Sequence, residues 1–194
     1  MSRFIAGLSR GLANDYEALA VVETFGQYEI NKRYSLRHQE RFKGISSGKL
    51  AKQIVELMNG KPFNKDIKIV LEVSSSGQIL VDTFAKAKLH CVAVTVTEDD
   101  TATSKESTYK VSKKQLIANL QFLFVAERLR MIKDLPVSKI ITKELLTYRL
   151  NNSSPDHENQ RVSKEPNHDD LVFALALACW YGQEVTRKEV RSRS

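Results

Sequence analysis

The sequence predicts an α/β domain built on a mixed sheet, with three antiparallel strands followed by parallel strands and with helices flanking the sheet. Three observations predict this fold class. The first third of the chain consists of short apolar and β-branched runs with brief links, the middle alternates strand-like with helix-like runs, and the last third is mostly helical in its period. A strand, a helix and a strand in succession normally form a right-handed crossover, which is why we expect the later strands to be parallel.

Composition limits the class of protein. The chain has 194 residues, of which 42% are hydrophobic and 27% charged, values typical of one globular domain. Lysine and arginine number 30 against 23 acidic residues, and the net charge of +7 favours a polyanionic partner. No apolar run approaches the ~18 residues of a membrane span, and the first residues lack the apolar stretch of a signal peptide. We therefore expect a cytoplasmic protein that has no membrane partner.

Three consecutive strands open the chain. They are expected at Phe4 to Leu8, Ala18 to Phe25 and Ile30 to Phe42. The turn-like residues Asn14 and Asp15 separate the first two strands, and the third alternates only loosely between polar and apolar side chains. Strands linked this closely favour an antiparallel meander.

The period then changes to that of helices and single strands. Ser46 or Ser47 is expected to cap a helix that ends at Asn59. Residues 44–50 have one residue too few for a phosphate-binding loop, and Leu50 replaces its Ser or Thr, so a helix start is the preferred interpretation. The next elements in order are a strand from Ile67 to Val73, a helix from Gly77 to Lys88 and a strand from Cys91 to Val96.

The second half of the chain contains its longest polar stretches. In chain order we expect a loop from Glu98 to Tyr109, a helix from Ser112 to Phe124, a short strand from Leu129 to Ile132, a helix from Ser138 to Leu150, a loop from Asn151 to Asn167, and a final helix from Asp169 or Asp170 to about Glu184. The domain is accordingly expected to span residues 1–184, followed by a basic tail at residues 185–194.

Four acidic residues occupy positions near predicted strand ends or helix starts. Asp15 follows the first strand, Glu72 lies in the fourth, and Asp169 and Asp170 open the last helix. Cleavage of a phosphodiester by two Mg²⁺ or Mn²⁺ ions needs several carboxylates from different elements, because hard cations prefer oxygen ligands. Adjacent elements bring such residues together at their tips, so the four acids are candidate metal ligands.

Each acid also has a structural interpretation. Asp15 is a residue type that favours turns, and Asp169 or Asp170 can cap the helix and interact favourably with its dipole. Glu72 shares a strand face with Lys68 and can be an ordinary solvent-facing or lysine-paired acid. If helices cover both faces of the sheet, however, an unpaired carboxylate there is costly, which favours a partner or a metal ion.

The last helix resembles a known signature. Residues 168–178, HDDLVFALALA, resemble the HDDLV-ALA motif of bacteriophage large-terminase nuclease domains. The likeness continues in the segments GLSRG (7–11), NDYEALAVVE (14–23), LRHQERF (36–42), VLEVSSSG (70–77), VSKKQL (111–116) and KELLTYR (143–149). That family is similar to ribonuclease H in fold, so the resemblance implies a ribonuclease H-like mixed sheet with the order of elements expected above.

The resemblance also implies a function. Members of the family bind two divalent metal ions and cut concatemeric viral DNA during genome packaging. By position, the ligands of Mg²⁺ or Mn²⁺ would be Glu72, Asp169 and Asp170, with Asp15 as an additional acid of the active site. The implied partners are double-stranded DNA and a terminase ATPase subunit, small terminase or portal, and the implied location is the host cell cytoplasm.

One position departs from the family pattern. The first-strand aspartate, which is the central metal ligand of the family, corresponds to Ser9, and Glu72 stands where the family usually has Asp. A serine hydroxyl is a neutral and weak ligand, so the replacement removes a charge that two dications need nearby. Three consequences remain open: Asp15 compensates, one metal ion suffices, or cleavage has been lost while DNA contact persists.

Basic residues supply candidate DNA contacts. Lys113, Lys114, Arg128 and Arg130 are expected to reach phosphates, although scattered charges are also typical of a solvated surface. The leading hypothesis is a metal-dependent endonuclease domain of the terminase type. Its alternatives are a catalytically degenerate DNA-binding or assembly module on the same fold, and a basic α/β protein without a nucleic-acid role.

Overall fold

The computed structural model describes residues 3–10, 16–26, 31–63, 65–73, 78–97, 104–105, 108–131 and 170–191. Two predicted elements lie outside the described residues, namely the helix from Ser138 to Leu150 and the loop from Asn151 to Asn167. The candidate ligands Asp15 and Asp169 lie outside them as well, whereas Glu72 and Asp170 are described.

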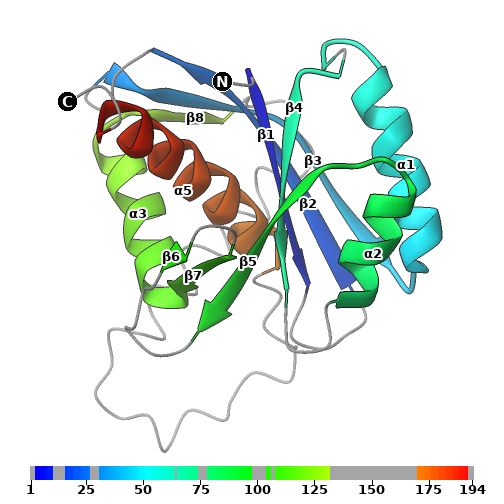
Figure 1. Ribbon diagram of the computed structural model, residues 1–194. Helices are drawn as coiled ribbons and strands as arrows, with labels where there is room; N and C mark the ends of the chain where they lie inside the picture. The colour runs from blue at the N-terminus through cyan, green and yellow to red at the C-terminus, as the bar shows by residue number, and fades with distance from the viewer. Residues whose placement is uncertain are drawn as a thin grey trace, which may run out of the picture.

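Within these residues the chain forms an eight-stranded sheet in the order β6-β7-β5-β4-β1-β2-β3-β8 (Figure 1). The strands are β1 (Phe4–Arg10), β2 (Tyr16–Phe25), β3 (Arg33–Lys43), β4 (Ile67–Glu72), β5 (Cys91–Thr97), β6 (Ser104–Lys105), β7 (Thr108–Ser112) and β8 (Leu129–Met131). The first three pair as the expected antiparallel meander, and β1, β4, β5 and β7 run parallel to one another. The short β6 pairs with β7 antiparallel, and β8 pairs with β3 in parallel. The predicted mixed sheet is confirmed.

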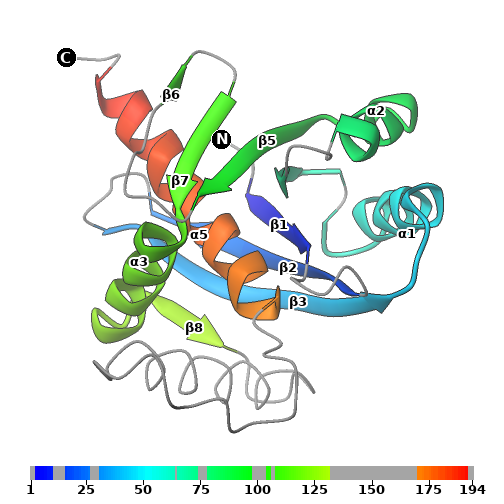
Figure 2. The same cartoon turned by 90° about the horizontal axis from the view of Figure 1, so that it is seen from below.

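The strand directions give the sheet two distinct ends. Because β1, β3, β4, β5 and β7 all point the same way, their carboxyl-terminal residues lie together at what we call the carboxyl end of the sheet. The opposite end is the amino end. Figure 2 views the molecule from the side of the carboxyl end, which is the lower side in Figure 1.

Helices cover both faces of the sheet. The helices are α1 (Ser47–Asn59), α2 (Gln78–Lys86), α3 (Lys113–Val125) and α5 (Asp170–Arg191). α1 and α2 lie on one face, and α3 and α5 lie on the other, which we call the α5 face (Figures 1 and 2). Each face buries a hydrophobic core, and successive side chains of the central strands alternate between the two, as Val70 and Leu71 do. No helix among the described residues has the length and apolar composition needed to cross a bilayer.

Two helices begin at the serine caps expected from the sequence. The hydroxyl of Ser46 accepts a hydrogen bond from the backbone N–H of Lys49 at 3.4 Å, and that of Ser112 accepts one from Gln115 at 3.1 Å. The glycine-containing run before α1 is therefore a helix start, as expected, and the predicted helices over this part of the chain are confirmed within one or two residues.

Two expectations about the second half of the chain are wrong. The segment from Glu98 to Tyr109, predicted to be a loop, contains β6 and the start of β7. Polar residues in that segment obscure its strands, because a short strand at the sheet margin needs little apolar surface. The final helix ends at Arg191 rather than near Glu184. Residues 185–191 are therefore helical, and their separation from the domain as a tail stays a prediction.

α5 lies directly against β1. A Cβ atom at Gly7 would lie 2.0 Å from the carbonyl oxygen of Ala174, so only glycine permits this approach. Near the other end of β1, Ile5 lies beside Gly182, where an added Cβ would be 3.1 Å from its Cδ1. β1 and α5 therefore run in opposite directions, and this arrangement brings the first turn of α5 to the carboxyl end of the sheet.

Candidate active site

The pairing register brings Ser9 and Glu72 together at the carboxyl end. β1 and β4 pair in parallel with Leu8 opposite Leu71, so the residues that follow are neighbours. The hydroxyl of Ser9 donates a hydrogen bond to Oε2 of Glu72 at 2.5 Å. Ser9 is buried and Glu72 is half-buried. The residue at the family's first-ligand position thus contacts the predicted ligand of the fourth strand.

Both side chains belong to the α5 face. Alternation along β1 puts Ser9 on the same side as Gly7, which contacts α5. Alternation along β4 puts Glu72 on the same side as Val70, which belongs to the core beneath α5. Because α5 runs opposite to β1, the start of this helix lies over this end of the sheet (Figure 2), and its first residue is Asp170.

Asp170 is buried and bound by Arg41 of β3. Its side chain is 1% exposed, against 22% for Arg41. Nε of Arg41 donates to Oδ2 at 2.7 Å and Nη2 donates to Oδ1 at 2.6 Å, a bidentate geometry that suits guanidinium and carboxylate. Beside this pair, the side-chain amide of Gln39 donates to the carbonyl oxygen of Leu171 at 3.2 Å. Two side chains of β3 thereby hold the first turn of α5.

A β-bulge puts Arg41 on the α5 face. The pairing of β3 with β2 shifts by one residue at Arg37. Before the shift, Leu36 belongs to the core beneath α5, and strict alternation from there would turn Arg41 to the opposite face. After the shift, Arg41 pairs with Ala18, which belongs to that same core. The extra residue therefore decides that Arg41 meets Asp170.

One row of residues crosses the carboxyl end on the α5 face. From β3 to β5 it consists of Arg41, Ala18, Ser9, Glu72 and Val94. With Asp170 attached to Arg41, the row contains two carboxylates and one guanidinium, so the formal charge is −2 + 1 = −1. The structure brings three of the predicted site positions, Ser9, Glu72 and Asp170, to one end of the sheet.

Arg41 is a functional candidate that was not predicted, and it has basic and aromatic neighbours. The guanidinium carbon of Arg41 lies 5.7 Å, and Nζ of Lys43 5.4 Å, from the ring centroid of Tyr16. One signal for this arrangement was visible beforehand, the loose alternation of the third strand, which reflects the bulge. Nothing in the residue order indicated that Arg41 contacts Asp170, which lies 129 positions away.

The predicted phosphate contacts Lys113 and Lys114 lie at the carboxyl end. They directly follow β7, whose carboxyl terminus points the same way as those of β1 and β4. Nζ of Lys113 lies 5.7 Å from the ring centroid of Phe173, which is in the first turn of α5. These two lysines are therefore on the same side of the molecule as Glu72.

The other two predicted phosphate contacts, Arg128 and Arg130, lie elsewhere. Arg128 precedes β8 and Arg130 lies in it. Because β8 pairs with the start of β3, Leu129 opposite Tyr34, both arginines are toward the amino end. Nε of Arg128 donates a hydrogen bond to the carbonyl oxygen of Lys32 at 2.7 Å. The structure thus separates the four predicted contacts into two pairs, and only one pair adjoins the candidate site.

The described donors suit a hard cation in their chemistry, but their charge is low. Carboxylate and hydroxyl oxygens are the ligands that Mg²⁺ and Mn²⁺ prefer. Both oxygens of Asp170, however, are bound by Arg41, and the described residues contain no group of three or more His, Cys, Asp or Glu side chains able to hold a metal ion. Glu72 beside Ser9 is the described position that suits one cation best, and further ligands would have to come from Asp170, Asp169 or Asp15.

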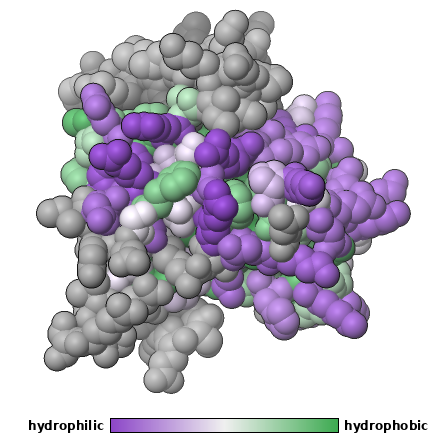
Figure 3. Space-filling view, turned by 90° about the horizontal axis from the view of Figure 1, so that it is seen from above, coloured by the Kyte–Doolittle hydropathy of each residue, from purple (hydrophilic) through white to green (hydrophobic). Residues whose placement is uncertain are grey.

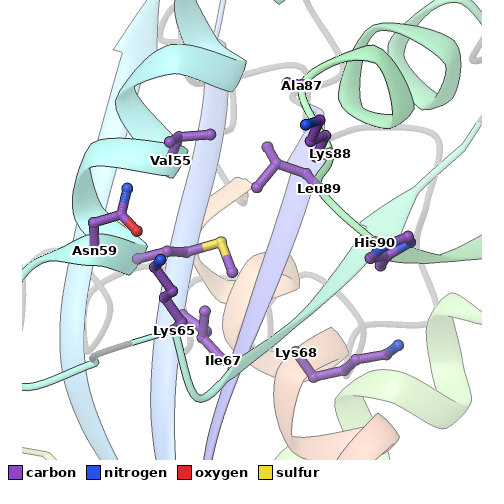
Figure 4. Close-up of a pocket in the computed structure, with 10 residues that line it drawn as sticks. Val55, Asn59, Lys65, Ile67, Lys68, Ala87, Lys88, Leu89 and His90 are labelled. Atoms are coloured by element: carbon purple, nitrogen blue, oxygen red, sulfur yellow. The ribbon is translucent and has the colours of Figure 1, made fainter.

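A surface groove lies at the other end of the sheet. Its volume is about 470 Å³, and it is bordered by the ends of α1 and α2 and the starts of β4 and β5 (Figure 4). Its lining residues are Val55, Met58, Asn59, Lys65, Ile67, Lys68, Ala87, Lys88, Leu89 and His90. Seen from the amino end, the surface is mainly hydrophilic with apolar atoms visible between polar groups (Figure 3). None of the candidate ligands lines this groove.

Comparisons with solved structures establish the fold. The large terminase nuclease from thermophilic phage G20c, with bound zinc, matches with a TM-score of 0.53 and 17% identity over 90% of this chain and 78% of that chain. The human cytomegalovirus terminase nuclease domain, soaked with manganese, matches with a TM-score of 0.58 and 12% identity over 95% and 85%. The large terminase from another thermophilic bacteriophage matches with a TM-score of 0.55 and 8% identity over 91% and 38%.

Sequence comparison adds no further relative. No family model matches the chain, and no curated protein matches it in sequence. The resemblance seen in the motifs is therefore supported through structure. The chain has the ribonuclease H-like fold of large-terminase nuclease domains, as the motifs implied.

Proposed function

We propose that the chain is a metal-dependent endonuclease domain of the viral terminase type, which cuts concatemeric double-stranded DNA during genome packaging. The observation that carries this proposal is the contact of Ser9 with Glu72 at the carboxyl ends of β1 and β4, beneath the start of α5. In the fold of terminase nucleases, this is where the resemblance puts the metal ligands. Zinc and manganese in the similar structures support the use of a divalent cation.

Glu72, Asp169 and Asp170 would hold the Mg²⁺ or Mn²⁺, and Asp15 would assist as a further acid. The bound cation would activate a water molecule and stabilise the leaving oxygen of the phosphodiester. Duplex DNA is the proposed substrate. We expect a terminase ATPase subunit, small terminase or portal as the protein partner, in the host cytoplasm.

The chain's own residues would orient the acids and attract the substrate. The hydroxyl of Ser9 fixes one oxygen of Glu72, and Gln39 fixes the backbone at the start of α5. Lys113 and Lys114 lie at the same end, where ammonium groups attract the phosphate backbone without reading sequence. Positioning on strands and a helix is more precise than positioning on loops, which favours reaction at a defined point.

Ser9 is expected to make cleavage slow. A neutral hydroxyl replaces the carboxylate that the family uses, and the described row retains a formal charge of only −1. The same observation supports a second candidate function, a DNA-binding or assembly module that has lost cleavage. In that case Arg41 would permanently neutralise Asp170, and DNA would bind without a divalent cation.

Nicking of supercoiled plasmid in Mn²⁺ tests the proposal. We expect slow, chelator-sensitive nicking by the wild type and a rate about 10²-fold higher for Ser9→Asp, since one well-placed charge contributes about that much to a transition state. Adding Glu72→Gln to Ser9→Asp should abolish the gain. No nicking by either the wild type or Ser9→Asp, together with DNA binding that is steeply salt-dependent and indifferent to Mg²⁺, would favour the second candidate.

A further inference from the structure

We infer that Arg41 is an internal counter-ion that holds Asp170 until DNA arrives, so that the binding of DNA phosphate and the binding of a divalent cation are coupled. This inference rests on the proposed function, because it includes Asp170 in the cation site. It gives Arg41 a positioning role that the terminase motif does not assign.

Asp170 needs a cationic partner where it lies. Its side chain is 1% exposed, and a carboxylate buried to that degree is costly without a counter-charge. Arg41 supplies the charge through hydrogen bonds of 2.7 and 2.6 Å that occupy both carboxylate oxygens. A divalent cation would require at least one of the same oxygens, so guanidinium and metal ion are alternative partners of Asp170.

Arg41 also has a route to an alternative partner. Its side chain is 22% exposed, so part of it borders solvent at the carboxyl end. Lys43 shares the ring of Tyr16 with it, and Lys113 lies against the first turn of α5. These cations would draw a DNA phosphate to this end of the sheet. Phosphate, like carboxylate, accepts two parallel hydrogen bonds from a guanidinium.

The exchange couples the two binding events. When Arg41 turns to a phosphate, Asp170 loses its counter-charge and gains affinity for a cation. Linkage makes the effect reciprocal, because DNA must tighten cation binding by the same factor as the cation tightens DNA binding. Without DNA, the ion pair weakens metal loading. The domain would therefore acquire its full cation site only on its substrate.

The test is a titration of the full chain with Mn²⁺, with and without a duplex of about 20 base pairs. Electron paramagnetic resonance measures the free aqueous Mn²⁺ and so gives the affinity of the protein for the ion. The variant is Arg41→Gln, and the matched control is Lys43→Gln, which removes one charge from the same strand end and the same tyrosine ring. Mn²⁺ bound by the duplex alone is subtracted. Without DNA, we expect Arg41→Gln to bind Mn²⁺ about tenfold more tightly than the wild type, and Lys43→Gln to differ less than about twofold. DNA should tighten Mn²⁺ binding by the wild type by about tenfold and leave Arg41→Gln unchanged.

The outcomes separate this inference from the proposed function. A folded Arg41→Gln protein that binds Mn²⁺ no more tightly than Lys43→Gln overturns the inference, while nicking by Ser9→Asp would still support the nuclease. If Arg41→Gln does not fold, the titrations of the wild type are sufficient. Equal affinity of the wild type for Mn²⁺ with and without DNA then overturns the inference. If none of the proteins binds Mn²⁺, with or without DNA, the inference is overturned. The proposed nuclease activity is then tested separately by plasmid nicking.

Discussion

The candidate site and the groove lie at opposite ends of the sheet and differ in how their charged residues are placed. At the carboxyl end, Asp170 is buried and paired, and Arg41 reaches it through a bidentate contact. At the amino end, Lys65 and Lys88 are exposed around the buried floor of a groove, and no described residue forms an ion pair with either. A hollow in the surface is therefore not enough to identify a candidate site. Burial and pairing alone do not single out the carboxyl end, because Glu23 near the amino end is also buried and is bound by Arg3 and Arg37. The carboxyl end differs in that its buried acid lies at the same end as the contact of Ser9 with Glu72.

The backbone supports the same contrast. Lys65 and Lys88 both adopt left-handed conformations, with φ of 67° and 60°, where the chain reverses after a helix. Their positions follow from local turns. Arg41 instead depends on a bulge between two long strands and on a helix far away in the sequence. Such an arrangement is retained only if both elements pack correctly.

The largest difference between the two ends should be in stability, measured by removing one charged side chain from each. Arg41→Ala leaves Asp170 buried without its partner, so the free energy of unfolding should fall by about 3–5 kcal/mol in the absence of divalent cations. Lys88→Ala removes an exposed and unpaired charge and should change stability by less than about 0.5 kcal/mol. Urea unfolding of both variants in chelator measures the difference. Equal losses would mean that the Arg41 pair does not stabilise the first turn of α5.

Replacing a glycine by alanine in β1 and in α1 should give a somewhat smaller difference in stability. Gly7→Ala puts a methyl group against the backbone of α5 and should destabilise the fold by about 1–3 kcal/mol while moving that helix from Ser9. Gly48→Ala in α1 has open space around it and should be neutral or stabilising by up to about 1 kcal/mol. Thermal unfolding gives both values. A neutral Gly7→Ala would contradict the close contact of α5 with β1.

Duplex DNA binding should show the smallest difference between the two ends. Lys43→Glu/Lys113→Glu should weaken binding at least about tenfold and reduce the salt dependence. Lys65→Glu/Lys88→Glu should weaken it less than about threefold at physiological salt. The reason is that β4 separates the ends by roughly 20 Å, at about 3.3 Å per residue, well beyond the Debye length of about 8 Å. Fluorescence anisotropy with a labelled duplex measures the affinity of both double variants. A larger loss of affinity for Lys65→Glu/Lys88→Glu would mean that DNA binds at the groove.

Local patterns predicted most of the fold. Short links between apolar runs indicated the antiparallel meander, and the serines that precede α1 and α3 marked their starts. β6 and β7 were missed because their polar residues resemble a loop, and the end of α5 was placed too early because basic residues continue the helix beyond its apolar part. Periodicity reports how much apolar surface an element buries. It cannot detect an element that buries little.

Only part of the candidate site was predicted. Its residues come from different strands and a helix, and local sequence patterns do not show which of these elements meet. The motif resemblance located Ser9, Glu72 and Asp170, and the register explains why they share one end of the sheet. Arg41 could not be predicted in the same way. Its face depends on a register shift in the pairing of β2 with β3, and an alternation pattern read from one strand does not reveal such a shift.

The most direct test of the central claim is a crystal of the Ser9→Asp protein soaked in Mn²⁺ and measured at the manganese absorption edge. If the carboxyl end of the sheet binds a divalent cation, an anomalous peak should lie about 2 Å from a carboxylate oxygen of Glu72, near the start of α5. A protein in which manganese occupies only other positions, such as His90 beside the groove, would contradict that claim.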